Sequence, residues 1–284
     1  MTETTESAAP RRSMILAAVS VAVLVALSAY AVAVDRGFTV VVVSWAAFLA
    51  MSVGIVLGAG QRSRNPFGFV WGYGLAGGAM ITSAAIFLVP QAIGYDPKLG
   101  GAGIALGLVS GYASHAIGHR LSHVSLPIDQ TTAQITAHAV AAGVVLGALY
   151  AADPQLGVVL GLAIASHKGP VGYAAGRRLS LAGRPIWPLA LPAAAMGVAA
   201  LAARFSGIAL TASSSAVLFG FATGIFLHLG MDFLPECEVG GEIHELVTTE
   251  PDAHAHTLLD RLRLHAVAGT TVGGVVVFGA WLIL

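Results

Sequence analysis

The feature that most constrains this chain is a series of apolar runs, each about 20 residues long, the length at which a helix crosses a bilayer. The runs are rich in Ala, Gly, Leu and Val and do not alternate. They therefore predict helices rather than the roughly ten-residue alternating strands of a membrane barrel. The nine predicted spans are Met14–Val34, Phe38–Gly58, Phe69–Ile93, Gly101–Gly118, Thr131–Ala151, Leu156–Gly176, Ile186–Ala203, Ser213–Leu234 and His265–Leu284.

Composition supports an all-α polytopic membrane protein. Hydrophobic residues make up 56% of the chain and charged residues 10%, whereas soluble domains carry about 25% charged residues. So few charges cannot cover the surface of a soluble domain of this length. The formal net charge is zero, so no nucleic-acid partner is indicated, and the single cysteine, Cys237, excludes an intramolecular disulfide. The 35 glycines fit the close packing of helices in lipid.

The orientation follows from the basic residues. The first run could be a signal peptide, but it is longer than the apolar part of one and no strong cleavage site follows, so we expect an uncleaved span. Lys and Arg gather at the cytoplasmic ends of spans. With the N-terminus inside, ten of them fall on inner segments and three, Arg36, Lys98 and Arg204, on outer ones. This predicts a plasma-membrane protein with a cytoplasmic N-terminus and its C-terminus outside.

Ionisable side chains inside a span are costly and mark candidate functional positions. They gather in three predicted spans: His138 in the fifth, His167 and Lys168 in the sixth, and His228 and Asp232 in the eighth. One lone histidine is more simply explained by a hydrogen bond between helices. A matched pair in neighbouring spans, with a third histidine in the eighth, favours a binding site.

The fifth and sixth spans share a pattern, because a glycine lies five residues after both His138 and His167. The sixth adds Pro170, which removes a backbone donor and should loosen the helix. Opened helices with a polar cluster at mid-membrane form the ion sites of many transporters. In addition, "IFLVPQ" ends the third span and "DFLPE", which closes with Glu236, ends the eighth in the opposite orientation. This echo is typical of an inverted repeat.

These motifs resemble those of the ZIP family of divalent-metal transporters. "HAVAAG", from His138, is similar to the family's fourth-span motif His-Asn-x-Pro-Glu-Gly, and "HKGPVG", from His167, is similar to its fifth-span motif. "AGGAMITSAAIFLVPQA" and "GIFLHLGMDFLPE" are similar to its second and seventh spans. The resemblance covers residues 38–284 and implies eight spans in a three-plus-two-plus-three inverted repeat. Residues 1–37 would then form a tail and an extra N-terminal transmembrane helix.

The chain departs from the family where the family has acids. The motif glutamates fall on Ala142 and Val171, and the acid after the fifth-span histidine falls on Lys168. A carboxylate-bridged pair of metals cannot be built from what remains. The resemblance therefore implies a mononuclear site for zinc or a similar divalent transition metal, which neutral imidazoles suit. Its protein ligands would be His138, His167 and either His228 or Asp232, with Glu236 as an alternative acid and water completing the shell.

Lys168 opposes such a site, because an ammonium close to a dication repels it. Three interpretations stay open. The side chain points away toward the inner, water-filled half, or burial makes the amine neutral, or its ammonium replaces the metal and pairs with Asp232. The third would give a re-tasked, non-transporting member of the fold.

The leading hypothesis is a permease for divalent transition-metal ions that works by alternating access between spans five and six, with no required cofactor. The alternative is the re-tasked membrane protein in which Lys168 replaces the metal. The permease would have no ATP site, because no nucleotide-binding motif appears. An enzyme is not expected, because no serine, cysteine or H-E-x-x-H arrangement accompanies the histidines and the aspartate of the spans. The predicted partners are the lipid bilayer and divalent metal ions, with a homodimer as an open option.

Two further stretches on the inner side carry histidines. His115, His119 and His123 recur every four residues, so they share one helix face. They form either a ladder that receives metal at the inner mouth or an amphipathic surface at the membrane interface. The stretch "DAHAHTLLDRLRLHA" is interpreted as a short amphipathic segment at the interface, and the loop before it as either solvated chain or a weak metal-collecting loop.

Overall fold

The computed structural model describes residues 8–60, 66–121, 129–152, 158–165, 167–206, 211–232, 234 and 252–283. Almost all of them lie in helices, and no strand occurs within these ranges. The elements are α1 (Ala8–Ala33), α2 (Phe38–Gly60), α3 (Pro66–Ser83), the π-helix η1 (Ala84–Leu88), α4 (Val89–Tyr95), α5 (Pro97–Leu121), α6 (Gln130–Ala152), α7 (Val158–Ala165), α8 (Lys168–Leu181), the 3₁₀ helix η2 (Trp187–Leu189), α9 (Ala190–Phe205), α10 (Ala212–Asp232) and α12 (Asp252–Ile283).

The prediction of an all-helical, multi-pass protein is confirmed in its coarse form. Each predicted span falls on a helix or on consecutive helices of the described chain. Within the part of the chain that the structure describes, six stretches are long and apolar enough to cross a membrane: Ser13–Ala33, Phe38–Gly60, Pro66–Tyr95, Trp187–Phe205, Ala212–Met231 and Thr257–Ile283. The remaining predicted spans lie on α5, α6 and the α7–α8 pair, which carry the polar residues or the break discussed below.

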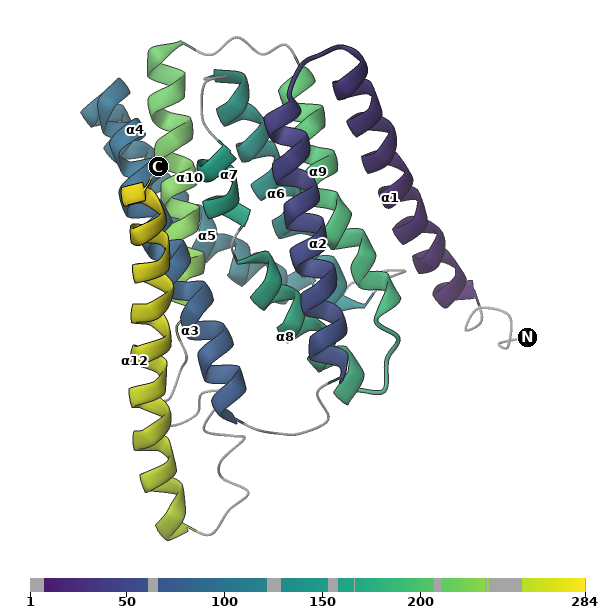
Figure 1. Ribbon diagram of the computed structural model, residues 1–284, viewed down its shortest axis with the longest axis vertical. Helices are drawn as coiled ribbons and strands as arrows, with labels where there is room; N and C mark the ends of the chain where they lie inside the picture. Colours follow the sequence, from purple (N-terminus) through teal and green to yellow (C-terminus); the bar gives the residue numbers. More distant parts are fainter. Residues whose placement is uncertain are drawn as a thin grey trace.

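The last helix differs from the prediction. The stretch expected as a separate interfacial segment is the first half of α12, which runs on without a break to Ile283 (Figure 1). The physical reason is that its apolar side has a protein partner: Leu259, Leu262 and Ala266 form a buried cluster with Val70 of α3. The apolar residues that predicted contact with lipid headgroups therefore pack against another helix.

Glycines bring the helices into backbone contact. In the pair α2 and α8, a Cβ added at Gly172 or Gly176 would clash with the carbonyl oxygens of Met51 and Ile55. The contacts advance together along both helices, so the two run parallel. Small residues four apart permit this close approach in lipid, where it supplies van der Waals contact that larger side chains would prevent.

Three more pairs are built in the same way. Glycines of α3 meet the backbone of α12, those of α5 meet α10, and those of α6 meet α9, each in parallel register. The glycines concerned are Gly74 and Gly78 in α3, Gly269 and Gly273 in α12, Gly103 and Gly107 in α5, Gly220 and Gly224 in α10, and Gly143 and Gly147 in α6.

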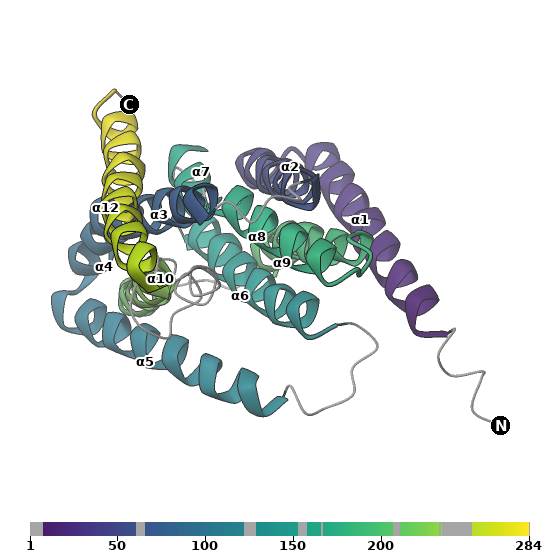
Figure 2. The same cartoon turned by 90° about the horizontal axis from the view of Figure 1, so that it is seen from below.

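These pairs assemble into two bundles, which lie side by side in Figures 1 and 2. One bundle holds α2, α6, α8 and α9, with α1 along its outer edge against α9. The other holds α3, α5, α10 and α12, together with α4. Contacts between the bundles are sparser and involve mainly α6 and α7–α8 on one side and α3 and α10 on the other. The centre of the molecule is therefore a seam between two tightly packed units.

A π-helical turn interrupts the third predicted span between α3 and α4 and packs against α10. It occupies Ala84–Leu88, where the backbone amide of Val89 donates to the carbonyl of Ala84. Pro90 follows in the first turn of α4 and cannot donate a backbone hydrogen bond. The turn overlaps the sequence echo "IFLVPQ". Single π turns of this kind are frequent at functional positions.

The backbone contacts can be tested at α8. We expect Gly176→Ala to lower the free energy of unfolding in detergent by about 1–3 kcal/mol, because the added methyl group would push α8 away from Ile55 of α2. Gly72→Ala is the matched control, since nothing lies within 4 Å of a Cβ at that helical position. Equal stability of the two variants would contradict the close approach.

Candidate functional site

The sixth predicted span is broken at its centre. α7 ends at Ala165 and α8 begins at Lys168, with His167 as the residue that precedes α8. Pro170 lies in the first turn of α8, where a missing amide donor costs nothing. Its ring would clash with the carbonyl four residues earlier in a continuous helix, and that residue, Ser166, lies outside the described residues. The proline therefore ends one helix and starts another rather than only loosening a single one.

Tyr150 holds the first half of this broken span in place. The backbone amide of Gly161, in α7, donates to the Tyr150 hydroxyl at 3.1 Å. Tyr150 lies on α6 and is 2% exposed, so the contact ties α7 to the helix that carries His138. Because Gly161 lies in the first turn of α7, the hydroxyl stabilises that helix end.

His138 and His167 meet at the break. Their ring centroids are 5.7 Å apart, so the sequence-predicted pair is brought together. His167 is fully buried, and the ring of Phe226 from α10 lies edge-on against it with centroids 5.8 Å apart. The Nε2 atom of His138 is buried and has no hydrogen-bond partner among the described residues. The pair thus lies on the seam, with α10 of the other bundle closing one side.

Lys168 lies at the same place. Its side chain is 1% exposed, and within the described part of the chain its Nζ atom has no hydrogen-bond partner. Side chains of a helix tilt toward its N-terminus, so the Lys168 side chain leans toward the start of α8, where His167 is the preceding residue. This burial argues against the interpretation in which the lysine turns to an inner, water-filled half. Two interpretations fit the burial of Lys168: the amine is neutral, or it is an ammonium that has an anionic partner.

His228 lies apart from the pair. It is two residues beyond Phe226 on α10 and therefore on another face of that helix. Its ring packs directly on Gly111 of α5, where an added Cβ would clash with it. The structure thus groups His138, His167 and Lys168 and places the His228 ring at the α5–α10 contact.

The other predicted site residues are described only in part. Asp232 is the last residue of α10, and His115 and His119 lie on the last turns of α5; in each case the backbone alone is described. Glu236 and His123 fall outside the described residues. Among the side chains that are described, no three of His, Cys, Asp and Glu come together as metal ligands.

Two buried residues were missed by sequence reasoning. Phe226 is one more apolar residue of the predicted eighth span, and its spacing does not mark it as a neighbour of His167. Arg177 lies one residue past the predicted end of the sixth span, but α8 continues to Leu181, and Arg177 is 4% exposed with its guanidinium 5.4 Å from the ring centre of Phe69. No glycine or proline lies between Gly176 and Gly183, which was the signal that the helix extends this far.

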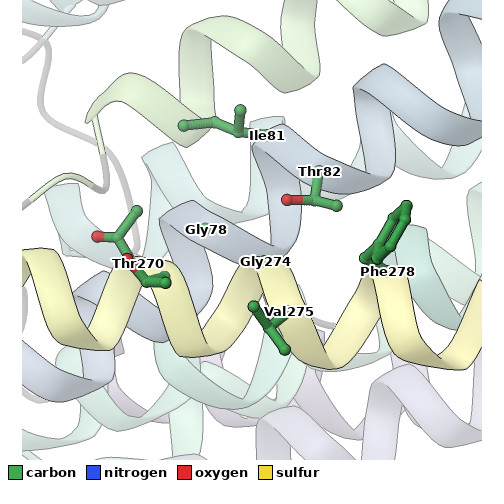
Figure 3. A pocket seen from close by; sticks show the side chains of 8 residues that line it. Gly78, Ile81, Thr82, Thr270, Gly274, Val275 and Phe278 are labelled. Atoms are coloured by element: carbon green, nitrogen blue, oxygen red, sulfur yellow. The ribbon is translucent and has the colours of Figure 1, made fainter.

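A shallow groove of about 380 Å³ lies elsewhere, between α3 and α12 (Figure 3). Threonines and apolar side chains line it: Ile81, Thr82, Thr270, Thr271, Val275 and Phe278, beside Gly78 and Gly274. None of these residues is ionisable, so this groove offers no ligand for a metal ion.

Comparison of the chain with protein-family models and with curated proteins finds no match.

Removing the Tyr150 hydroxyl tests how α7 is held. We expect Tyr150→Phe to lower the free energy of unfolding by about 1–3 kcal/mol, because the Gly161 amide loses its partner in a buried place. Amide hydrogen exchange at Gly161 should speed up by the corresponding factor. Tyr112→Phe, at a side chain that is 72% exposed, should change neither quantity. Unchanged exchange in Tyr150→Phe would show that this hydrogen bond does not hold α7.

Proposed function

We propose that this chain is a ZIP-like membrane permease for divalent transition-metal ions, zinc or a similar ion. In this proposal it lies in the plasma membrane with a cytoplasmic N-terminus. Ions pass the His138–His167 pair, and access alternates between the two sides of the membrane. The observation that carries the proposal is that these two histidines, from neighbouring spans with matching motifs, meet at a helix break on the seam between two bundles.

The pattern of helix pairs supports the inverted repeat. In the proposed inverted repeat, α2 corresponds to α9, α3 to α10 and α5 to α12, and the central helices α6 and α8 correspond to each other. The pair α2–α8 then becomes α9–α6, and the pair α3–α12 becomes α10–α5. All four are among the tight parallel pairs of the fold. A three-plus-two-plus-three arrangement therefore accounts for which helices pack together, with α1 as an addition outside the repeat.

The seam gives a physical route for alternating access. Within each bundle, backbones in contact at glycines resist sliding, whereas the two bundles meet through fewer contacts. A relative movement of the bundles would change which side of the histidine pair is open, as in other transporters built from repeats. Two imidazoles suit zinc, cobalt or nickel, and water would complete the shell.

Uptake by reconstituted protein tests the permease. We expect proteoliposomes to accumulate Zn²⁺ down its gradient, and the double variant His138→Ala, His167→Ala to fall to the level of empty liposomes, because both imidazole ligands are gone. The measurement is zinc inside the vesicles, read with a trapped fluorescent indicator.

The control for this experiment is His265→Gln. The Nδ1 atom of His265 accepts a hydrogen bond from the Trp71 indole at 3.0 Å between α3 and α12, away from the pair. This variant should transport as the wild type does. Uptake that persists in the double variant would remove the histidine pair from the ion path.

A second function is favoured by one observation, the burial of Lys168 directly after His167, whose ring is paired with that of His138. An ammonium there could occupy the place of the metal, which would make the chain a re-tasked, non-transporting membrane protein. The absence of motif acids at Ala142 and Val171 supports this alternative as well.

Metal analysis separates the two functions. If Lys168 replaces the metal, protein purified without chelator should contain no stoichiometric transition metal by elemental analysis, and dialysis against Zn²⁺ should add none at the site. The permease predicts zinc bound by the wild type and lost in the double histidine variant. Tightly bound metal at about one ion per chain would exclude the replacement by lysine.

A further inference from the structure

The start of α8 concentrates positive charge inside the protein. The first amides of a helix have no partner within it, and the helix dipole places a partial positive charge at that end. Acidic residues are normally favoured in such a first turn. α8 has none there, and its first residue is instead Lys168, whose side chain is 1% exposed. Two like charges thus share one buried place.

Lys168 supplies a second, independent sign of a ligand. Its Nζ atom has no hydrogen-bond partner among the described residues, although it is buried. Lys168 is the first residue of α8, and helical side chains tilt toward the N-terminus of their helix, so the amine lies on the same side as the helix end. A buried ammonium requires an anionic partner.

We propose that the break between α7 and α8 binds a small inorganic anion of chloride size. The Lys168 ammonium and the backbone amides of Lys168 and Gly169 are its donors. The amide of Val171 is engaged by the carbonyl of His167 at 3.0 Å, and Pro170 has none, so the donor set ends there. Helix starts with free amides are ready-made anion sites, and the buried ammonium adds a charge-assisted contact.

The packing limits the anion to a small one. Gly54 of α2 lies directly on the backbone carbonyl of Gly169, and Gly172 lies on that of Met51, so α2 closes one side of the first turn. His138 and His167 close another side. A bound anion would also offset the Lys168 charge that opposes a dication at the histidine pair. The anion site itself does not depend on metal transport.

Direct binding of radioactive chloride to the purified protein in detergent tests the proposal. Ionic strength is held constant with a large organic sulfonate. We expect saturable binding that Lys168→Met weakens about tenfold or more, the loss typical of a charge-assisted contact, while Lys168→Arg retains it. Arg178→Met, which removes an exposed cation from the same helix, should bind as the wild type does. Should Lys168→Met not fold, as judged by its melting temperature, Lys168→Gln gives the same comparison.

The possible outcomes are distinct. If the wild type binds no chloride, or if binding is unchanged in Lys168→Met, the proposal is wrong; the first result is expected if a carboxylate of the chain, such as Asp232, already pairs with the amine. Chloride binding without zinc uptake would support the anion site and contradict the permease. Zinc uptake without chloride binding would support the permease and contradict the anion site.

Discussion

In a bilayer, helices gain little by hiding apolar surface from one another, because lipid tails are as apolar as leucine. Close contact between backbones is then one of the few sources of affinity, and it requires residues without side chains at the crossing. This chain meets that requirement four times with glycines spaced by four residues. Each pair is parallel, so an odd number of other spans lies between its two partners in the sequence. That separation excludes a simple meander in which neighbouring spans form the tight pairs, and it interleaves the two halves of the chain.

The same constraint explains where the polar groups lie. Where glycines put two backbones in contact there is no space for a large polar side chain, so most ionisable side chains described inside the spans lie at the seam or where a glycine makes room. His265, beside Trp71 between α3 and α12, is an exception. A glycine makes room for His228, whose ring lies on Gly111. The seam holds His138, His167 and Lys168, at the break of the sixth span. The candidate site is therefore the part of the interior that glycine packing leaves open to polar chemistry.

Much of the fold was readable because apolar runs and glycine spacing are local properties of the sequence. The positions of the spans and the meeting of His138 with His167 followed from such patterns. Pro170 indicated a loosened sixth span, but its division into two helices, α7 and α8, was not predicted, because local sequence does not decide whether a proline kinks a helix or ends it. The packing partner of α12 was not predicted either. Apolar residues that suit a membrane surface suit a neighbouring helix equally well, and Leu259 and Leu262 pack against Val70 of α3. His228 was grouped with the pair because spacing along α10 does not reveal which neighbour each face meets.

The position of Lys168 links the chemistry of the site to any movement of the fold. The lysine starts α8, and α8 is in backbone contact with α2 at Gly172 and Gly176. Backbone contact at these glycines opposes sliding of α8 along α2. Packing is sparser across the seam, where the ring of Phe226 lies against His167. In the proposed permease, a ligand that alters the net charge at the break would therefore act first on the contact between the bundles, because the electrostatic change and the sparser packing lie at the same place.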